Sequence, residues 1–226
     1  MRNYFAQIGA ILWKDLRVEL RTRERLITMG AFAVLAAILF NYATDRVGVS
    51  HEDIAAGLVW MTIVFAGLLG VGRTFHLEAE DGALQGILLS PVPKDAVFLA
   101  KALSNFVLLY IVALLVVAVF MLFFGLEVGS SAGMIALVIG LGVLGFVALG
   151  TLFSAISTGT RMGETLLPVL VFPLLAPVVI YGTSATSQFL EGRPVTEAEG
   201  SIKMLAAFAL MALFAGSWLF RFVVED

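Results

Sequence analysis

Six stretches of the chain contain no Asp, Glu, Lys or Arg, and their lengths constrain the fold more than any other feature. A helix needs about 20 mainly apolar residues to cross the hydrocarbon core of a bilayer. Each stretch can hold one such helix, provided that the last, of 17 residues, continues through Phe222–Val224. The uncharged stretches are 26–44, 54–72, 102–126, 128–160, 165–190 and 204–220.

The composition supports the same interpretation. Hydrophobic residues make up 60% of the 226 residues and charged residues 14%, whereas soluble domains carry about 45–50% and about 25%. The net charge of −3 does not suggest a nucleic-acid partner, and the lack of cysteine excludes disulfides and thiolate metal ligands. We therefore predict an all-α membrane protein with a single domain over 1–226. Its six transmembrane helices are expected at about 26–44, 54–72, 102–125, 132–156, 165–182 and 204–223.

The basic residues beside these stretches predict the orientation of the chain. Cytoplasmic flanks of membrane proteins carry an excess of Lys and Arg. Eleven basic residues lie in the N-terminal segment, the second and fourth connections and the C-terminal tail, against three in the other connections. We therefore expect both termini in the cytoplasm, and acidic outer loops near 51–53 and 191–199.

The first 25 residues are predicted to form an amphipathic helix that does not span the membrane. Apolar side chains repeat on one stripe and basic side chains on the opposite one, as in a helix that lies in the headgroup region. Glu19 interrupts the apolar face, so either the helix turns there or Glu19 pairs with a residue such as Arg23. A plain positively charged anchor is the alternative. The apolar stripe is Phe5, Ile8, Leu12 and Leu16, and the basic stripe is Lys14, Arg17, Arg21 and Arg25.

The connection at 73–101 is the longest cytoplasmic loop, and its sequence predicts a short helix at about 79–89. Apolar residues recur there at helical spacing, and a Ser-Pro pair ends the pattern. Such a helix, placed below the bilayer, can seat in a groove of a cytoplasmic partner and transmit its motion. The alternative is a helix that lies on the surface and covers the bundle. The apolar edge is Leu84, Ile87 and Leu88, the stop is Ser90-Pro91, and Asp95 can cap the next helix.

The stretch from Glu78 to Pro93 also carries a family resemblance. Its pattern E-x-E-D-G-x-L-x-x-x-L-L-S-P-V-P resembles the cytoplasmic loop of ABC-2-type transporter permeases. In length, six spans, basic N-terminal helix and short outer loops, the whole chain is most similar to the haem exporter protein B (CcmB) family of cytochrome c maturation.

This resemblance implies a non-catalytic permease subunit that dimerises in the bacterial inner membrane. It would dock a separate ATP-hydrolysing subunit (CcmA-like) through this coupling loop, with the N-terminal helix as the elbow helix beside the dock. Further partners would be a haem-handling membrane protein (CcmC-like) and a small membrane protein (CcmD-like). ATP hydrolysis would drive either haem export or release of a haem-loaded chaperone. The docking residues implied are Glu78, Glu80, Asp81, Gly82, Leu84, Ile87, Leu88, Ser90, Pro91 and Pro93.

No motif in the chain predicts catalysis or a bound cofactor. The phosphate-binding pattern G-x-x-x-x-G-K-[ST] does not occur. Gly140, Gly142 and Gly145 match G-x-G-x-x-G, but they lie inside an apolar span with no preceding strand. Small residues of this kind allow helices to approach closely in bilayers. We interpret them as a packing surface, either between two subunits or within one.

The fifth span contains Pro168, Pro173 and Pro177. Pro168 can occupy the first turn, whereas each of the other two removes an amide donor from the helix. We therefore expect a kink or a break. It could act as a moving hinge or as a static bend, and the sequence does not distinguish these.

Two further observations bear on the alternatives for function. His51 and His76 lie among acidic residues and do not resemble axial haem ligands. The amide side chains Asn41, Asn105 and Gln188 lie toward the ends of their stretches, and no ionisable group lies inside one. This weakens the case for an independent secondary carrier, which commonly needs a buried carboxylate. A non-transporting scaffold that passes ATPase motion to another protein remains the second interpretation.

Overall fold

The computed structural model describes residues 2–47, 51–75, 86–87, 89–126, 128–158 and 163–224. These residues fold into helices and contain no strand, which confirms the predicted all-α class. A 3-10 turn at Gly129–Ser131 precedes α7. The α-helices are α1 (Arg2–Thr22), α2 (Glu24–Val47), α3 (His51–Val71), α6 (Lys94–Phe124), α7 (Ala132–Thr158), α8 (Gly163–Leu174), α9 (Ala176–Leu190) and α10 (Val195–Val223).

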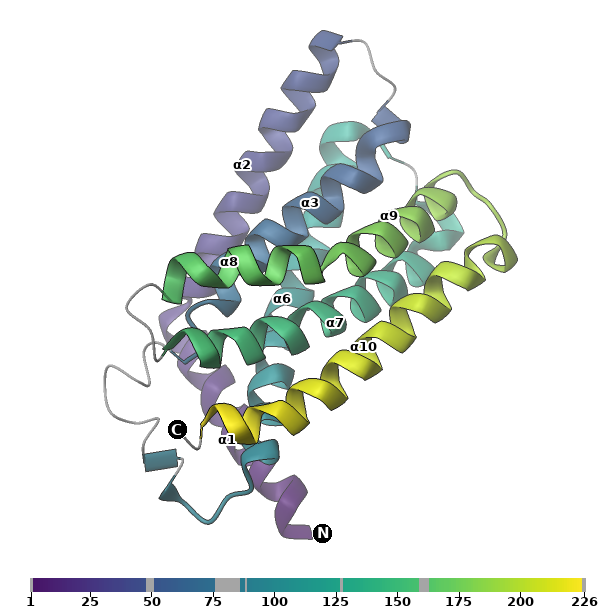
Figure 1. Cartoon of the computed structure of the whole chain (residues 1–226). Helices are drawn as coiled ribbons and strands as arrows, with labels where there is room; N and C mark the ends of the chain where they lie inside the picture. The colour runs from purple at the N-terminus through teal and green to yellow at the C-terminus, as the bar shows by residue number, and fades with distance from the viewer. Residues whose placement is uncertain are drawn as a thin grey trace.

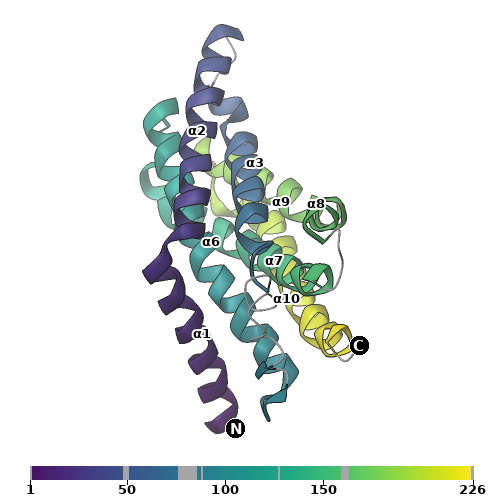
Figure 2. The same cartoon turned by 90° about the vertical axis from the view of Figure 1, so that its left-hand side faces the viewer.

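Helix α7 lies at the centre of the bundle and contacts α3, α6, α8, α9 and α10 (Figure 1). Helices α2 and α3 pack on the second half of α6, and α1 packs along its beginning (Figure 2). The first residues of α1 and the end of α10 lie at the same end of the bundle, away from the turn that joins α9 to α10 (Figure 1). The expectation that both termini share one side therefore fits this arrangement, whereas the identity of that side stays a prediction.

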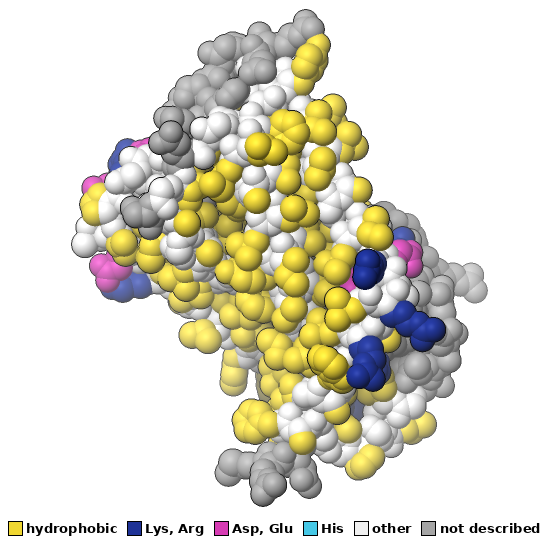
Figure 3. Space-filling model, turned by 180° about the vertical axis from the view of Figure 1, so that it is seen from behind, with side chains coloured by type: hydrophobic (Ala, Val, Ile, Leu, Met, Phe, Trp, Pro, Cys, Tyr) yellow, Lys and Arg dark blue, Asp and Glu magenta, His cyan; other side chains and the backbone are white. Residues whose placement is uncertain are grey.

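Five helices are long and apolar enough to cross a membrane, namely α2, α3, α6, α7 and α10, and the bent pair α8–α9 makes up to six. Seen from behind, charged side chains gather at two opposite edges of the molecule, with a broad hydrophobic band between them (Figure 3). Many large apolar side chains of these helices are exposed, for example Leu35 and Leu39 of α2 and Leu122 of α6. Such a surface is stable only against lipid or other apolar partners.

Two of the observed helices begin well before the predicted spans. Helix α6 begins at Lys94 because its first turns pack against α1 and are therefore stabilised without lipid. Helix α10 begins at Val195, where the sequence suggested an outer loop. Its added turns carry an ion pair at helical spacing, Lys203 with Glu199 at 2.6 Å. Glu197 also pairs at 3.4 Å with Arg193, which lies just before the helix.

The fifth predicted span is broken at Leu175, where α8 and α9 meet at a bend of 52°. The expectation for Pro177 is wrong, because Pro177 lies in the first turn of α9, where the amide of a helical residue would have no intrahelical acceptor. Pro173 lies inside α8 and deprives the carbonyl of Val169 of its donor. Pro168 also lies inside α8 and not in its first turn, because the helix begins at Gly163.

The glycines of α7 pack within the chain. A Cβ atom on Gly142 would collide with the indole of Trp60, and one on Gly145 would come within 2.9 Å of the Phe208 ring. Trp60 is 1% exposed, and its indole Nε1 donates a hydrogen bond to Thr186 Oγ1 at 3.0 Å. Gly142 and Gly145 therefore form a packing surface within one subunit, which is one of the two interpretations that the sequence left open.

Candidate functional site

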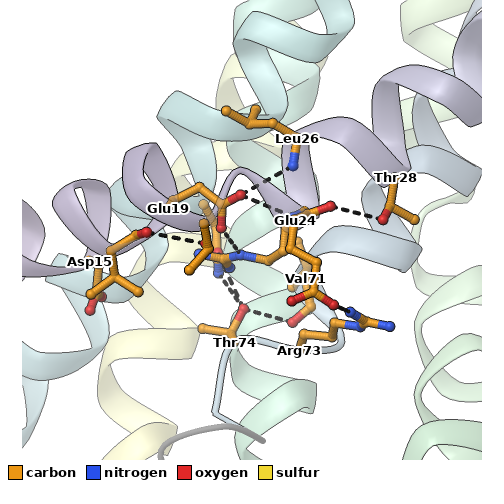
Figure 4. Close-up of polar contacts among 12 residues, drawn as sticks. Asp15, Glu19, Glu24, Leu26, Thr28, Val71, Arg73 and Thr74 are labelled. Carbon is orange, nitrogen blue, oxygen red and sulfur yellow. Dashed lines mark hydrogen bonds and ion pairs between the residues drawn. The ribbon is translucent and has the colours of Figure 1, made fainter.

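Seven polar side chains form a buried group where α1 ends, which we call the junction cluster. They come from α1, α2, the turn after α3, α6 and α7, so the cluster joins five parts of the fold (Figure 4). Within the cluster, Glu19, Lys101 and Asn105 are each only 3% exposed. The members are Asp15, Glu19, Arg25, Thr74, Lys101, Asn105 and Thr151.

The cluster is built around the break between α1 and α2 at Arg23. Arg23 has a φ of 55°, the left-handed conformation that commonly ends a helix. Its amide donates to the carbonyl of Glu19 at 2.6 Å and thereby closes the last turn of α1. The chain then enters α2 directly at Glu24. The break places the side chain of Glu19 beside the first turn of the next helix.

Glu19 caps α2 from the preceding helix. Its Oε1 accepts hydrogen bonds from the amides of Arg25 at 3.0 Å and Leu26 at 3.2 Å (Figure 4). Its Oε2 accepts one from Arg25 Nε at 2.7 Å. The first amides of a helix have no intrahelical acceptors, and the helix dipole favours an anion at this end. One buried carboxylate therefore satisfies both the helix terminus and a guanidinium.

Arg25 extends the cluster toward α6 and α7. Its Nη1 donates to Asn105 Oδ1 at 3.3 Å. The amide nitrogen of Asn105 donates to the hydroxyl oxygens of Thr74 and Thr151, both at 2.9 Å. The Thr74 hydroxyl in turn donates to the carbonyl of Val71 at 2.7 Å (Figure 4). This chain of bonds fixes the start of the 73–101 segment to α2, α6 and α7.

Lys101 fixes the far end of that segment. Its ammonium lies 3.0 Å from Asp15 Oδ2 and 5.7 Å from the centre of the Phe75 ring. Asp15 also pairs with Lys14 at 3.0 Å. Charges buried this deeply are tolerated only when they are paired and hydrogen-bonded. The two carboxylates and two cations of the junction cluster meet this condition.

Two less buried contacts lie at the edge of the cluster. Arg73 Nη1 donates to Glu24 Oε1 at 2.7 Å, and the Tyr4 hydroxyl donates to Asp95 Oδ2 at 2.6 Å. Burial, together with the hydrogen bond to the Asp95 carboxylate and its negative charge, raises the pKa of Tyr4 to about 12. Both ends of the segment 73–101 are thus tied to α1 or α2.

The structure corrects part of the prediction for the N-terminal segment. Lys14, Arg17 and Arg21 are exposed, as expected for a basic stripe. Arg25 does not belong to this stripe, because it follows the break at Arg23 and its side chain is only 15% exposed.

The sequence suggested for Glu19 either a turn of the helix or an ion pair, and the structure contains both. The chain turns four residues after Glu19, and the partner of Glu19 is Arg25 instead of Arg23. Helix α1 presents Asp15 to Lys101 of α6 and Glu19 to the first turn of α2, while Phe5 of the predicted apolar stripe is 70% exposed.

Part of the predicted coupling loop is described. Gly86, Ile87 and Leu89 are helical, and Ser90 Oγ donates to the carbonyl of Ile87 at 2.6 Å. Ile87 packs against an apolar group that includes Phe75, Phe98 and Phe220, where α6, α7 and α10 meet. Pro91 and Pro93 lead into α6. The predicted docking residues Glu78, Glu80, Asp81, Gly82, Leu84 and Leu88 lie outside the described residues, as does His76.

Asp95 does not act as the predicted helix cap. Pro93 occupies the N-cap position of α6, and the carbonyl of Pro93 accepts the amide of Ala96 at 3.0 Å. Asp95 lies in the first turn of α6, where an acidic side chain also suits the helix dipole. Its carboxylate is directed to Tyr4 instead.

Sequence reasoning missed the junction cluster as a unit. The pattern of charges predicts Lys101 only as part of a basic cytoplasmic flank, and Asn105 only as an amide near the end of an uncharged stretch. One signal was available, because Asp15 and Glu19 are four residues apart and therefore share a face of α1. A helix that carries two carboxylates toward its packed side requires buried cations opposite them.

The fold and this cluster define a multi-pass α-helical membrane protein whose N-terminal helix is joined to the bundle by buried ion pairs. The model of the CcmB protein family matches residues 6–224, so the chain belongs to the CcmB family. This confirms the resemblance seen in the sequence.

Proteins called Heme exporter protein B are similar to this chain along most of its length. The protein from Rhodobacter capsulatus is 29% identical over 87% of this chain and 88% of the relative. The protein from Pseudomonas aeruginosa is 29% identical over 94% and 92%, and the protein from Escherichia coli K12 is 28% identical over 95% and 100%.

Proposed function

We propose that this chain is the permease subunit of an ABC transporter complex in cytochrome c maturation. It couples ATP hydrolysis by a separate ATPase subunit to haem export, or to release of a haem-loaded chaperone. The chain itself performs no catalysis. Its membership of the CcmB family and the name of its relatives, Heme exporter protein B, support the assignment to haem export.

The attachment of the segment 73–101 at both ends is the observation that supports coupling. Arg73 and Thr74 at its start are bound to Glu24 and Asn105, and Asp95 and Lys101 at its end are bound to Tyr4 and Asp15. A force applied to this segment would therefore reach α1, α2 and α6 together through short polar contacts. A loop without such contacts would absorb the same displacement by bending.

In this proposal the segment 73–101 and both termini face the cytoplasm of a bacterial inner membrane. The excess of basic residues on these flanks supports that orientation. The helix near 79–89 docks a CcmA-like ATPase, and α1 is the elbow helix beside it. Two copies of the chain pair in the complex, together with CcmC-like and CcmD-like membrane proteins. Haem is cargo, and ATP is bound by the partner.

Retention of the ATPase by variants of the docking segment tests this proposal. Glu80→Lys, Asp81→Lys and Leu88→Asp should each insert in the membrane normally but lose most of the ATPase during purification in mild detergent. Glu199→Lys is the matched control, because Glu199 is an exposed acid near the start of α10, and the start of α10 lies at the end of the bundle away from this segment. Undiminished retention in all three variants, or an equal loss in Glu199→Lys, would refute docking at this segment.

A flux measurement separates export from chaperone release. If haem accumulates in inverted vesicles only when both this chain and ATP are present, the subunit takes part in transport. If chaperone release requires ATP while no haem flux is detected, the subunit acts as a scaffold that transmits ATPase motion. If haem moves without any ATPase, the ABC assignment itself is wrong.

A further inference from the structure

A groove of about 520 Å³ lies between the beginning of α6 and the end of α10, outside the junction cluster. In Figure 1 these two helix ends lie side by side at the lower end of the bundle. One wall is formed by Val92, Lys94 and Asp95, and the other by Phe214, Trp218 and Arg221. The groove is therefore charged at its base and aromatic on one side.

The described residues that line the groove carry more positive than negative charge, which favours an anion. Lys94 and Arg221 contribute two cations from different helices, while Asp95 contributes one carboxylate that already accepts the Tyr4 hydroxyl. The guanidinium of Arg221 lies 5.5 Å from the centre of the Trp218 ring and 4.6 Å from that of Phe222. These contacts hold the guanidinium at the groove, and because they use its face, its N–H groups can donate to a phosphate.

An apolar track leads from the charged base along α10 toward the middle of this helix. Every fourth residue on this face is a large exposed apolar side chain. At 1.5 Å per residue the track is about 18 Å long, comparable with half of the hydrocarbon core, which is roughly 15 Å. The residues and their exposed fractions are Leu210 67%, Phe214 76%, Trp218 52% and Phe222 49%.

We propose that this groove binds an anionic phospholipid. The phosphate lies between Lys94 and Arg221, and one acyl chain lies along the α10 track. Basic pockets between transmembrane helices are known places for acidic lipid headgroups, and aromatic residues such as Trp218 favour the interface between headgroups and hydrocarbon. A bound lipid would connect the end of α10 to the end of the 73–101 segment.

This proposal requires only that α10 spans the membrane, so it can hold even if the chain has no part in haem export.

Lipid retention by the purified full-length protein provides the test. Native mass spectrometry after exchange into a neutral detergent, with phosphatidylglycerol or phosphatidylcholine added, reports the lipid that stays bound. We expect preferential retention of phosphatidylglycerol, reduced by about fivefold in Lys94→Gln and again in Arg221→Gln. Arg221→Lys should keep most of the binding, because it retains the charge. Arg193→Gln, at the other end of α10, is the matched control and should behave as the unchanged protein.

Several results would overturn the proposal. Equal retention of the two lipids, or unchanged retention in both the Lys94→Gln and Arg221→Gln variants, would show that no acidic headgroup is recognised. A thermal shift with inorganic phosphate as large as that with phosphatidylglycerol would make the site a phosphate site. If Phe214→Ser converts a dimer into a monomer while phosphatidylglycerol retention is unchanged, the α10 face is an interface between two copies of the chain.

Discussion

Two breaks between consecutive helices, both within the described part of the chain, are held by different forces. At Arg23, between α1 and α2, no proline or glycine is present. The carboxylate of Glu19 satisfies the new helix end and pairs with Arg25. At Leu175, between α8 and α9, Pro173 removes a backbone donor from the end of α8 and Pro177 lies in the first turn of α9. The amide of Leu175 still bonds to the carbonyl of Val171 at 3.0 Å.

This difference separates a break made by the backbone from one made by side chains. A proline break is present in any conformation of the chain, because the missing amide cannot be restored by a neighbour. The break at Arg23 depends on buried charges that must find each other in the folded protein. We therefore expect the first break to be sensitive to single polar substitutions and the second to respond mainly to loss of proline.

Removal of the Glu19 charge should have the largest effect. Glu19→Gln leaves the guanidinium of Arg25 buried without its carboxylate, and loss of one partner of a buried pair costs about 3–5 kcal/mol. The measurement is the free energy of unfolding by SDS titration in mixed micelles. Glu24→Gln is the control, because the Glu24–Arg73 pair is 64% and 50% exposed and should contribute about 0–1 kcal/mol. If Glu19→Gln and Glu24→Gln lowered the free energy of unfolding equally, burial would not be what distinguishes the two ion pairs.

Relief of the strained backbone at Arg23 should have a smaller effect of opposite sign. The left-handed conformation costs an L-residue roughly 1–2 kcal/mol, so Arg23→Gly should stabilise the protein by about 1 kcal/mol after the entropy of glycine is included. Thr22→Gly, inside the last turn of α1, should instead lose about 1 kcal/mol. The same SDS titration reports both values. A destabilised Arg23→Gly variant would mean that the arginine side chain, not its φ, holds the break.

Proline removal should change the shape of α8–α9 more than its stability. In Pro173→Ala the new amide can bond to the carbonyl of Val169, so the 52° bend should open. Spin labels on cysteines introduced at Leu170 and Glu191 should then move apart by about 2 Å, from a rise of 1.5 Å per residue. The chain has no native cysteine to interfere. Pro177→Ala is the control, and an unchanged distance in both variants would assign the bend to packing.

The smallest expected effect is the pH dependence at Tyr4. Its pKa is raised from the ordinary value of 10.0 to about 12 in the folded protein. The folded state therefore keeps a proton that the unfolded state loses, so this contribution to stability is complete below pH 10 and disappears as the pH rises to about 12. The difference in ultraviolet absorbance between the unchanged protein and Tyr4→Phe measures this ionisation. A tyrosine titrating near its ordinary pKa would show that the Asp95 contact is absent.

Much of the fold follows from local features of the sequence. Each uncharged stretch must be helical to satisfy its own backbone in a bilayer, so the helices can be counted one at a time. The break in the fifth span follows from Pro173, because a proline inside a helix removes a donor from that helix. Pro177 instead lies in the first turn of the helix that follows the break. The glycines of α7 predicted close packing, but only the structure shows that Trp60 and Phe208 fill the space beside them.

The sequence by itself therefore determined the class of protein, the helices and the places where a backbone cannot continue. Tertiary structure decided which charges are buried together. Lys101 and Asp15 are separated by 86 positions, and Arg25 and Asn105 by 80. The cost of burying any one of them is offset only by a partner that packing brings close. No local sequence pattern shows which charges are buried together, because a charged residue becomes buried only when the helices around it pack.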